Sequence, residues 1–236
     1  MNRKQYNLKG VLMDKSVRNI EIPLAKNAIK KAGLYIAEKK DLDRMAEAAA
    51  DAFQDYPLYN WLSKGKYDPV AAKLITKISV KAMMKDAVIY ADSEEMNGFA
   101  VWIPIGFNGN KAIPFMLNGG MKLILHSGPG IIGRLVTFEN YAMKLKKQFT
   151  DHYDWYLYNL FVRKDAQGKG IASKLLRPML QFCDDERMVA YLETNKDTNA
   201  DLYRHFGFEV MNEEIVPKAN FMHYAMLRRP KGETQQ

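Results

Sequence analysis

The run from Leu160 to Ser173 constrains the fold of this chain more than any other stretch. An apolar strand ending at Val162 passes into a turn that carries Gly168 and Gly170, and an apolar helix starts directly after that turn. Glycine lets the backbone adopt positive φ and approach a ligand closely. The free N–H groups of the first helical turn and the positive end of the helix dipole then form an anion site. The stretch therefore predicts a strand–turn–helix unit whose natural ligand is a pyrophosphate.

Two other phosphate-binding loops fit this stretch poorly. The Walker pattern requires G-x-x-x-x-G-K-[ST], and that spacing is absent here. A dinucleotide fingerprint requires a glycine or alanine three positions after its second glycine, but Ser173 stands at that position. It also expects an acidic residue about 20 positions further on at the end of the next strand, and none stands there clearly. Neither loop is therefore expected.

A second motif lies downstream. Tyr191-Leu192-Glu193-Thr194-Asn195 is followed by a string from Asn199 to Glu209 of the form N-x-x-x-Y-x-x-x-G-F-E. Together with Gln167-x-x-Gly170-x-Ala172, it resembles the two signatures of the GNAT family of N-acetyltransferases. The resemblance is detailed from 155 to 227, looser from 34 to 103 and absent from 1–32. The Tyr-Leu-Glu-Thr run and residues 53–62 look most like the puromycin-type and related small-amine acetyltransferases.

The resemblance implies that acetyl-CoA is the acyl donor and that a primary amine is the acceptor. It assigns cofactor binding to the strand, the glycine turn, the following helix start and a later helix: Leu160, Phe161, Val162, Gln167, Gly168, Lys169, Gly170, Ile171, Ala172, Ser173, Asn199 and Tyr203. In the family, the residue matching Asn199 contacts the CoA arm, and the residue matching Tyr203 stands near its sulfur.

The chemistry of two side chains agrees with these roles. A phenol with an ordinary pKa of about 10 is protonated at neutral pH, so Tyr203 can donate a proton to a departing thiolate as a general acid. Direct transfer also requires a neutral amine, for which Glu193, at the end of its strand, is the candidate general base, with water as the alternative. Backbone N–H groups near Phe161 or Val162 are candidates for holding the oxyanion.

Strand and helix patterns alternate along the chain, which predicts an α/β (α+β) fold with a central mixed, twisted sheet flanked by helices. We expect an N-terminal extension at 1–32, a single domain at 33–230 with a helical insert at about 106–150, and a tail at 231–236. Within the domain, Asp68-Pro69 predicts a helix start. The spacing of the helix that follows predicts that Val70, Leu74, Ile78 and Ala82 are buried.

Composition excludes little but sets the context. The chain has 236 residues, of which 47% are hydrophobic and 26% charged, as in ordinary soluble globular proteins. Its N-terminus lacks the apolar run of a secretory signal, and no apolar stretch is long enough to span a membrane, so we expect a cytoplasmic protein without a membrane partner. The lone cysteine, Cys183, falls on an apolar helical stripe, where we expect a buried thiol rather than a nucleophile.

The remaining titratable residues and the charge suggest few other sites. The four histidines show no metal-ligand spacing, so no metal is expected. Surface or capping roles are predicted for them, with His126 a possible acceptor-pocket residue. The net charge of +8 fits a phosphorylated ligand, while no interleaving of aromatic and basic residues supports a nucleic-acid partner.

Several alternatives stay open from the sequence. The fold fits a non-catalytic acyl-CoA-binding regulatory module as well as an enzyme. Within the enzymes, the acceptor can be a small amine, a protein N-terminus or a lysine side chain. The sequence fixes neither the acceptor, the oligomeric state nor a preference for an acyl donor other than acetyl-CoA.

Overall fold

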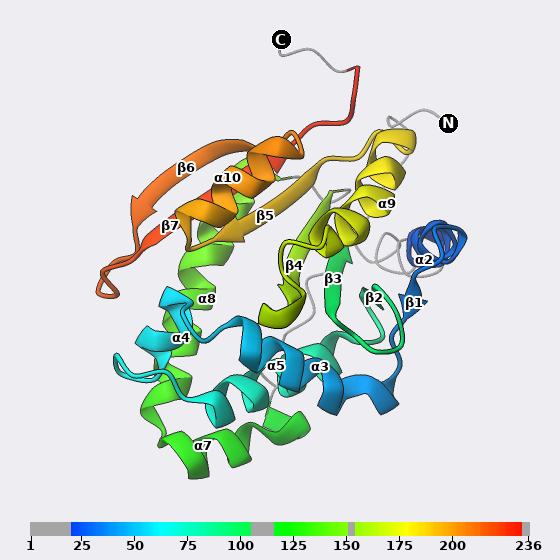
Figure 1. The fold of residues 1–236 in the computed structure, drawn as a ribbon. Helices are drawn as coiled ribbons and strands as arrows, with labels where there is room; N and C mark the ends of the chain where they lie inside the picture. The colour runs from blue at the N-terminus through cyan, green and yellow to red at the C-terminus, as the bar shows by residue number, and fades with distance from the viewer. Residues whose placement is uncertain (1–19, 105–115, 151–153, 233–236) are drawn as a thin grey trace.

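The computed structural model describes residues 20–104, 116–150 and 154–232 (Figure 1). Seven strands form one mixed sheet in the order β1-β2-β3-β4-β5-β7-β6. Neighbouring strands are antiparallel except β4 and β5, which run parallel. The strands are β1 (Tyr35–Ile36), β2 (Val88–Ala91), β3 (Gly98–Pro104), β4 (Trp155–Val162), β5 (Ala190–Thr194), β6 (Glu209–Ile215) and β7 (Met222–Arg228). The predicted mixed sheet is confirmed.

Helices cover both faces of this sheet (Figure 1). On one face lie α2 (Ile22–Lys31), α9 (Ile171–Asp185) and α10 (Asp197–His205). On the other lie α3 (Leu42–Ala52), α4 (Pro57–Leu62), α5 (Pro69–Met83), α7 (Met121–Ser127) and α8 (Gly130–Phe149). Because both faces are covered, every residue of the central strand β3 is buried, and its sequence reads as a nearly continuous apolar run.

The start of α5 follows the predicted capping chemistry, but its buried face differs. The Asp68 carboxylate accepts hydrogen bonds from the N–H groups of Val70 and Ala71, both at 3.0 Å. The buried stripe is centred on Ala71, Ile75 and Ile78, whereas Val70 is 47% exposed. The prediction that Val70 is buried is therefore wrong, because the face that meets α3 and the sheet lies one position further round the helix.

The predicted helical insert contains α7 and α8, and its first part, residues 106–115, lies outside the described residues. The apolar stripe of α8 is buried at Ile131, Phe138, Ala142 and Leu145. Of the helices in the described ranges, none has the length and apolarity needed to cross a membrane. The domain boundary at residue 32 stays a prediction, and the helix α2 just before it packs its apolar face against α9.

The centre of the sheet opens where β4 leaves β5. The strand β4 pairs with β5 only through its first three residues, Trp155 to Leu157, although it continues to Val162. The register between β3 and β4 also slips at this point: Val101 is opposite Asn159, but Trp102 is opposite Leu157. The residue left over on β4, Tyr158, forms a β-bulge, which bends a strand and re-aims its side chains. The fold therefore provides an opening between two parallel strands, next to a bulge.

Candidate active site

The glycine turn before α9 has the geometry of an anion site. Gly168 and Gly170 have φ of 75° and 77°, in the left-handed region, and added Cβ atoms would meet no neighbouring atom within 4 Å. Gly170 is the N-cap of α9, and no side chain caps the first turn of that helix. The N–H groups at the predicted positions Ile171, Ala172 and Ser173 therefore face a space that a ligand can enter.

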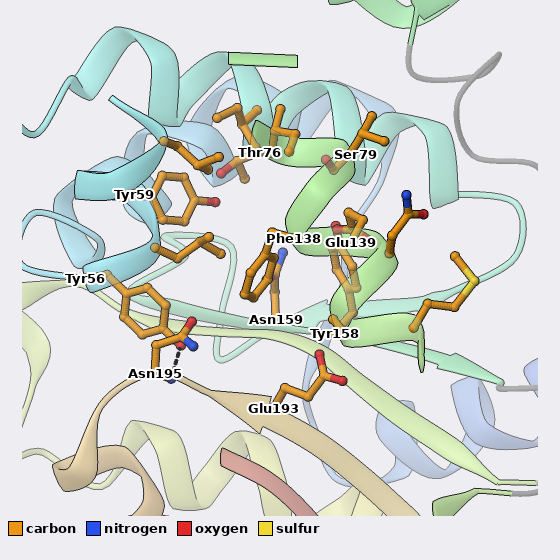
Figure 2. A pocket seen from close by; sticks show the side chains of 18 of the residues that line it. Tyr56, Tyr59, Thr76, Ser79, Phe138, Glu139, Tyr158, Asn159, Glu193 and Asn195 are labelled. Atoms are coloured by element: carbon orange, nitrogen blue, oxygen red, sulfur yellow. Dashed lines mark hydrogen bonds between the residues drawn. The ribbon is translucent and has the colours of Figure 1, made fainter. Parts of the chain in front are cut away.

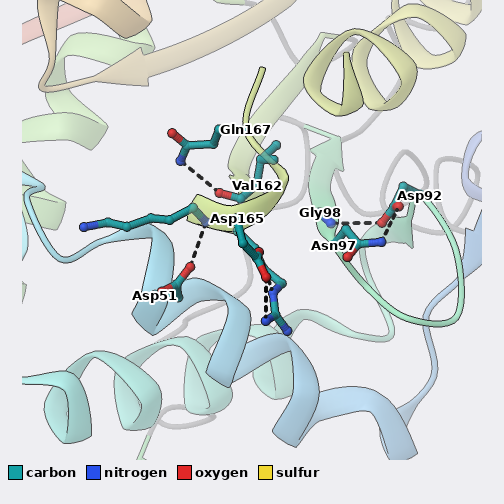
Figure 3. A network of polar contacts seen from close by, with 9 residues as sticks. Asp51, Asp92, Asn97, Gly98, Val162, Asp165 and Gln167 are labelled. Carbon is teal, nitrogen blue, oxygen red and sulfur yellow. Dashed lines mark hydrogen bonds and ion pairs between the residues drawn. The ribbon is translucent and has the colours of Figure 1, made fainter. Parts of the chain in front are cut away.

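A network of polar contacts fixes the approach to this turn (Figure 3). The Gln167 amide donates to the Val162 carbonyl oxygen at 3.2 Å, so this side chain braces the turn. The Lys164 N–H donates to the Asp51 carboxylate at 2.7 Å and ties the turn to α3. A Cβ on Gly98 would lie 2.7 Å from the Phe161 carbonyl oxygen and 2.8 Å from Ile171, so only glycine lets α9 start this close to the sheet.

The basic side chains around the turn have different roles. Lys169, a predicted cofactor-binding residue, is exposed next to the glycines. Lys174, in the first turn of α9, donates from its ammonium to the Asp92 carbonyl oxygen at 2.8 Å. Arg177, which the sequence reasoning missed, donates to the Ser173 hydroxyl at 2.8 Å and so places a guanidinium beside the first turn of α9. The i,i+4 spacing of Ser173 and Arg177 on a helix was the available signal.

A cavity lies beside the opening between β4 and β5, where Asn159 of β4 and Glu193 of β5 form part of its wall. Beyond Leu157, the edge of β4 that faces β5 is unpaired in the described sheet, so its backbone can bind an extended ligand there. Leu160 packs toward α9, while Phe161 packs toward α3. The structure therefore brings Leu160, Phe161 and Val162 to the same opening as the glycine turn.

The cavity has a volume of about 470 Å³. Its wall comes from the segment around α4, from α5 and α8, and from β4, β5 and β7. In Figure 2, Glu193 and Asn195 rise from β5 and the residues after it, and Tyr59 and Glu139 approach from the helices. The wall is largely aromatic and aliphatic, with a few polar groups, which is typical of a small-molecule site.

Glu193 is the most perturbed acid of this cavity. Its Oε1 accepts from the Tyr191 hydroxyl at 2.8 Å, and its Oε2 accepts from the Tyr156 hydroxyl at 3.1 Å. Burial raises the pKa of Glu193 from 4.5 to about 7, against the lowering effects of the Tyr191 hydrogen bond and the positive charge of Lys146. A carboxyl group with a pKa close to neutrality can both accept and release a proton at physiological pH.

Tyr203 lies on α10 one helical turn after the half-buried Asn199. Its ring is buried on the α9 side of the sheet, 5.8 Å from the Phe208 ring centroid. Burial raises the pKa of the Tyr203 phenol above its ordinary value, and Tyr56, which lines the cavity, raises it further. The phenol is therefore protonated at neutral pH, and it lies near Tyr56 on the far side of the β4–β5 opening.

The sequence reasoning missed most of the cavity and misplaced one histidine. His223, expected at the surface or in a cap, is fully buried in β7 and lines the cavity. His126 lies on α7, where its Nε2 pairs with Asp68 at 2.9 Å, outside the cavity lining. The position of His223 inside the apolar run from Phe221 to Leu227 was the available signal, because a histidine in a central strand is buried. Cys183 is buried, as predicted, and burial raises the pKa of its thiol.

Comparisons with known proteins show what this region of the chain is similar to. The model of the acetyltransferase (GNAT) domain matches residues 130–210, which include α8, β4, the glycine turn, β5 and α10. An uncharacterised N-acetyltransferase of Schizosaccharomyces pombe is 27% identical over 215 residues, covering 84% of this chain and 83% of that protein.

Solved structures agree on the fold. A Corynebacterium glutamicum protein described as a histone acetyltransferase and related acetyltransferase has a TM-score of 0.58 at 21% identity, covering 86% of this chain and 98% of that one. Arylalkylamine N-acetyltransferase 2 of Aedes aegypti has a TM-score of 0.56 at 17% identity, covering 83% and 97%. With both signature motifs placed around one opening in the sheet, residues 130–210 match the acetyltransferase (GNAT) domain, and the chain as a whole has the fold of these acetyltransferases.

Proposed function

We propose that the protein transfers an acetyl group from acetyl-CoA to a small primary amine bound in the cavity. The observation that carries this proposal is the position of Glu193: a carboxyl group with a pKa of about 7 lines the cavity beside the opening between β4 and β5. An amine acceptor must lose a proton before it attacks, and this carboxylate is placed to accept one.

Acetyl-CoA fits the residues on the other side of the opening. The uncapped N–H groups of Ile171, Ala172 and Ser173, with Gly168 and Gly170 beside them, suit a pyrophosphate. The unpaired edge of β4 beyond Leu157 suits the amides of the pantetheine arm, and Asn199 suits the same arm from α10. The donor, when bound, supplies the activated acetyl group as a thioester.

The protein's own groups then move the protons. Glu193, directly or through water, removes a proton from the acceptor ammonium, and Tyr156 and Tyr191 hold the carboxylate in place through their hydroxyl groups. Backbone N–H groups near Phe161 or Val162 polarise the carbonyl under attack. Tyr203 donates its phenolic proton to the departing sulfur. The C–N bond forms as the C–S bond breaks, and the products are an N-acetylated amine and free CoA.

A turnover screen tests this proposal. Purified protein is incubated with acetyl-CoA and a panel of arylalkylamines, polyamines and peptides, and release of the CoA thiol is followed. We expect turnover with one or more small amines. A Tyr203→Phe variant should bind acetyl-CoA with unchanged affinity by calorimetry, yet lose roughly 10- to 100-fold in kcat. An unchanged kcat of this variant across pH would refute the acid role of Tyr203, and lack of acetyl-CoA binding by the wild type would refute the whole proposal.

A further inference from the structure

A fully buried imidazole forms part of the cavity wall and has no place in the proton transfers above. His223 lies on β7 and lines the same cavity as Glu193. The Phe138 and Tyr141 rings meet it edge-on, with centroids 5.6 and 5.2 Å from the imidazole. These contacts fix the plane of the imidazole ring, so its two nitrogens have fixed directions.

Hydrogen bonding determines which nitrogen of His223 carries the proton. The Asn195 side-chain nitrogen lies 3.1 Å from the Met222 carbonyl oxygen and 3.0 Å from His223 Nδ1. A carbonyl oxygen can only accept, so the Asn195 atom in these contacts is the amide NH2 group, with two hydrogens to donate. It gives one hydrogen to Met222 and the other to His223, and Nδ1 is thereby an acceptor. In a neutral imidazole the remaining hydrogen is then on Nε2.

The Nε2–H group of His223 is buried and has no hydrogen-bond partner within the described parts of the chain. Burial lowers the pKa of His223 to about 4, so the ring stays neutral at physiological pH. A buried donor without a partner is costly, and each such group in a folded protein calls for a reason. Binding a ligand that supplies an acceptor atom removes that cost.

The sheet sets the distance between this donor and the proposed base. In the β5–β7 register, Glu193 is opposite Ala225, and His223 lies two residues from Ala225 along β7. Glu193 and His223 therefore project from the same face as diagonal neighbours, whose Cα atoms are about 7 to 8 Å apart in such pairs. An amine bound at Glu193 therefore has His223 as its neighbour on the cavity wall.

We propose that His223 is a specificity-determining residue, which donates a hydrogen bond from Nε2 to an oxygen of the acceptor. The inference rests on the proposed acceptor role of this cavity and narrows its substrate class. The preferred acceptors are amines with an apolar body and a hydroxyl, ether or carbonyl oxygen two or three carbons from the nitrogen. The apolar body packs on the aromatic wall, and the oxygen gives Nε2–H its partner.

A pair of amines that differ only in this oxygen tests the inference: 2-amino-1-phenylethanol and 2-phenylethylamine. Their binding to the wild type is measured by calorimetry, and kcat/KM is measured with acetyl-CoA. We expect the amino alcohol to be preferred by about tenfold or more, mainly through KM. His223→Phe keeps an aromatic ring but removes the donor, and should reduce the preference to within about twofold. His223→Gln restores an N–H donor and should recover part of it.

The tautomer of His223 in the wild type gives a second test. A nitrogen-detected NMR spectrum of the imidazole groups, with His223 assigned by its loss in His223→Gln, should show the Nε2–H tautomer. The Nδ1–H tautomer, equal binding of the two amines by the wild type, binding of neither, or an unchanged preference in His223→Phe would each overturn the inference. A clear binding preference without acetyl transfer would support the role of His223 and refute only the proposed reaction.

Discussion

The two sides of the β4–β5 opening are built in different ways. On the α9 side, the ligand meets backbone: two glycines in the left-handed region, the uncapped first turn of α9 and the unpaired edge of β4. On the other side, the ligand meets side chains from elements far apart in the chain, from Tyr56 to His223. A backbone site suits a group that all substrates share, such as the pyrophosphate of the proposed donor, whereas a side-chain site can change with the acceptor.

We expect the largest loss of activity from a substitution in the cavity. Glu193→Gln keeps the shape of the residue and can still pair with Tyr156 and Tyr191, but it cannot accept a proton. We expect kcat to fall by about 10² to 10⁴ at pH 7, with unchanged affinity for acetyl-CoA by calorimetry. In the wild type, kcat/KM should rise with pH through an apparent pKa near 7, because the carboxylate form is the active one. A variant with full activity would show that water or another group removes the proton.

Substitutions of Gly170 test the glycine turn and the first turn of α9. Gly170→Glu places a carboxylate at the positive end of α9, where it should repel the pyrophosphate and weaken acetyl-CoA binding by roughly 100-fold or more. Gly170→Ala is the matched control, because it imposes the same backbone strain at positive φ without the charge. If the two variants lose the same affinity, strain rather than charge is responsible. Amine binding in the cavity should be unchanged in both.

The free energy of unfolding should depend on pH, because the Glu193 carboxyl group is buried. The folded-state pKa of Glu193, about 7, is above its ordinary value of 4.5, so its contribution to stability is present below pH 4.5 and is lost as the pH rises through 7. We therefore expect Glu193→Gln to be more stable than the wild type at pH 8 by about 1 to 3 kcal/mol, after allowance for partial exposure. Urea unfolding at pH 5 and pH 8 measures this, and an equal difference at both values would contradict it.

The smallest expected effect comes from Lys146, whose charge acts on the pKa of Glu193. The Lys146 ammonium lies 4.6 Å from the Tyr156 ring centroid, and its charge lowers the pKa of Glu193. Removing that charge with Lys146→Met should move the pH–rate profile to higher pH by a fraction of a unit, with kcat at high pH retained. Lys147→Met, on the exposed side of the same helix, is the control and should leave the profile unchanged. A shift toward lower pH would contradict the proposed coupling.

The same contrast explains what the sequence could predict. The site on the α9 side is formed by contiguous residues. The strand β4, the glycine turn and the start of α9 were therefore predicted within a residue of their observed bounds. The cavity depends on which distant side chains the sheet brings together, and no local pattern carries that information. His223 is the clearest case, since its neighbour Asn195 is 28 residues away along the chain. Glu193 was predicted as the base from its place at the end of a strand, shortly before the second family motif.

The bulge at Tyr158 has a further consequence for which changes the strand β4 can tolerate. Upstream of it, odd-numbered residues Trp155 and Leu157 pack toward α9, whereas downstream the odd-numbered Phe161 packs toward α3. One extra residue thus reverses, between the two ends of β4, which face of the sheet the odd-numbered side chains occupy. Deleting a single residue at the bulge would move the side chains of residues 159–162 to the opposite faces of the sheet. Such a strand tolerates point substitutions and is intolerant of changes in length.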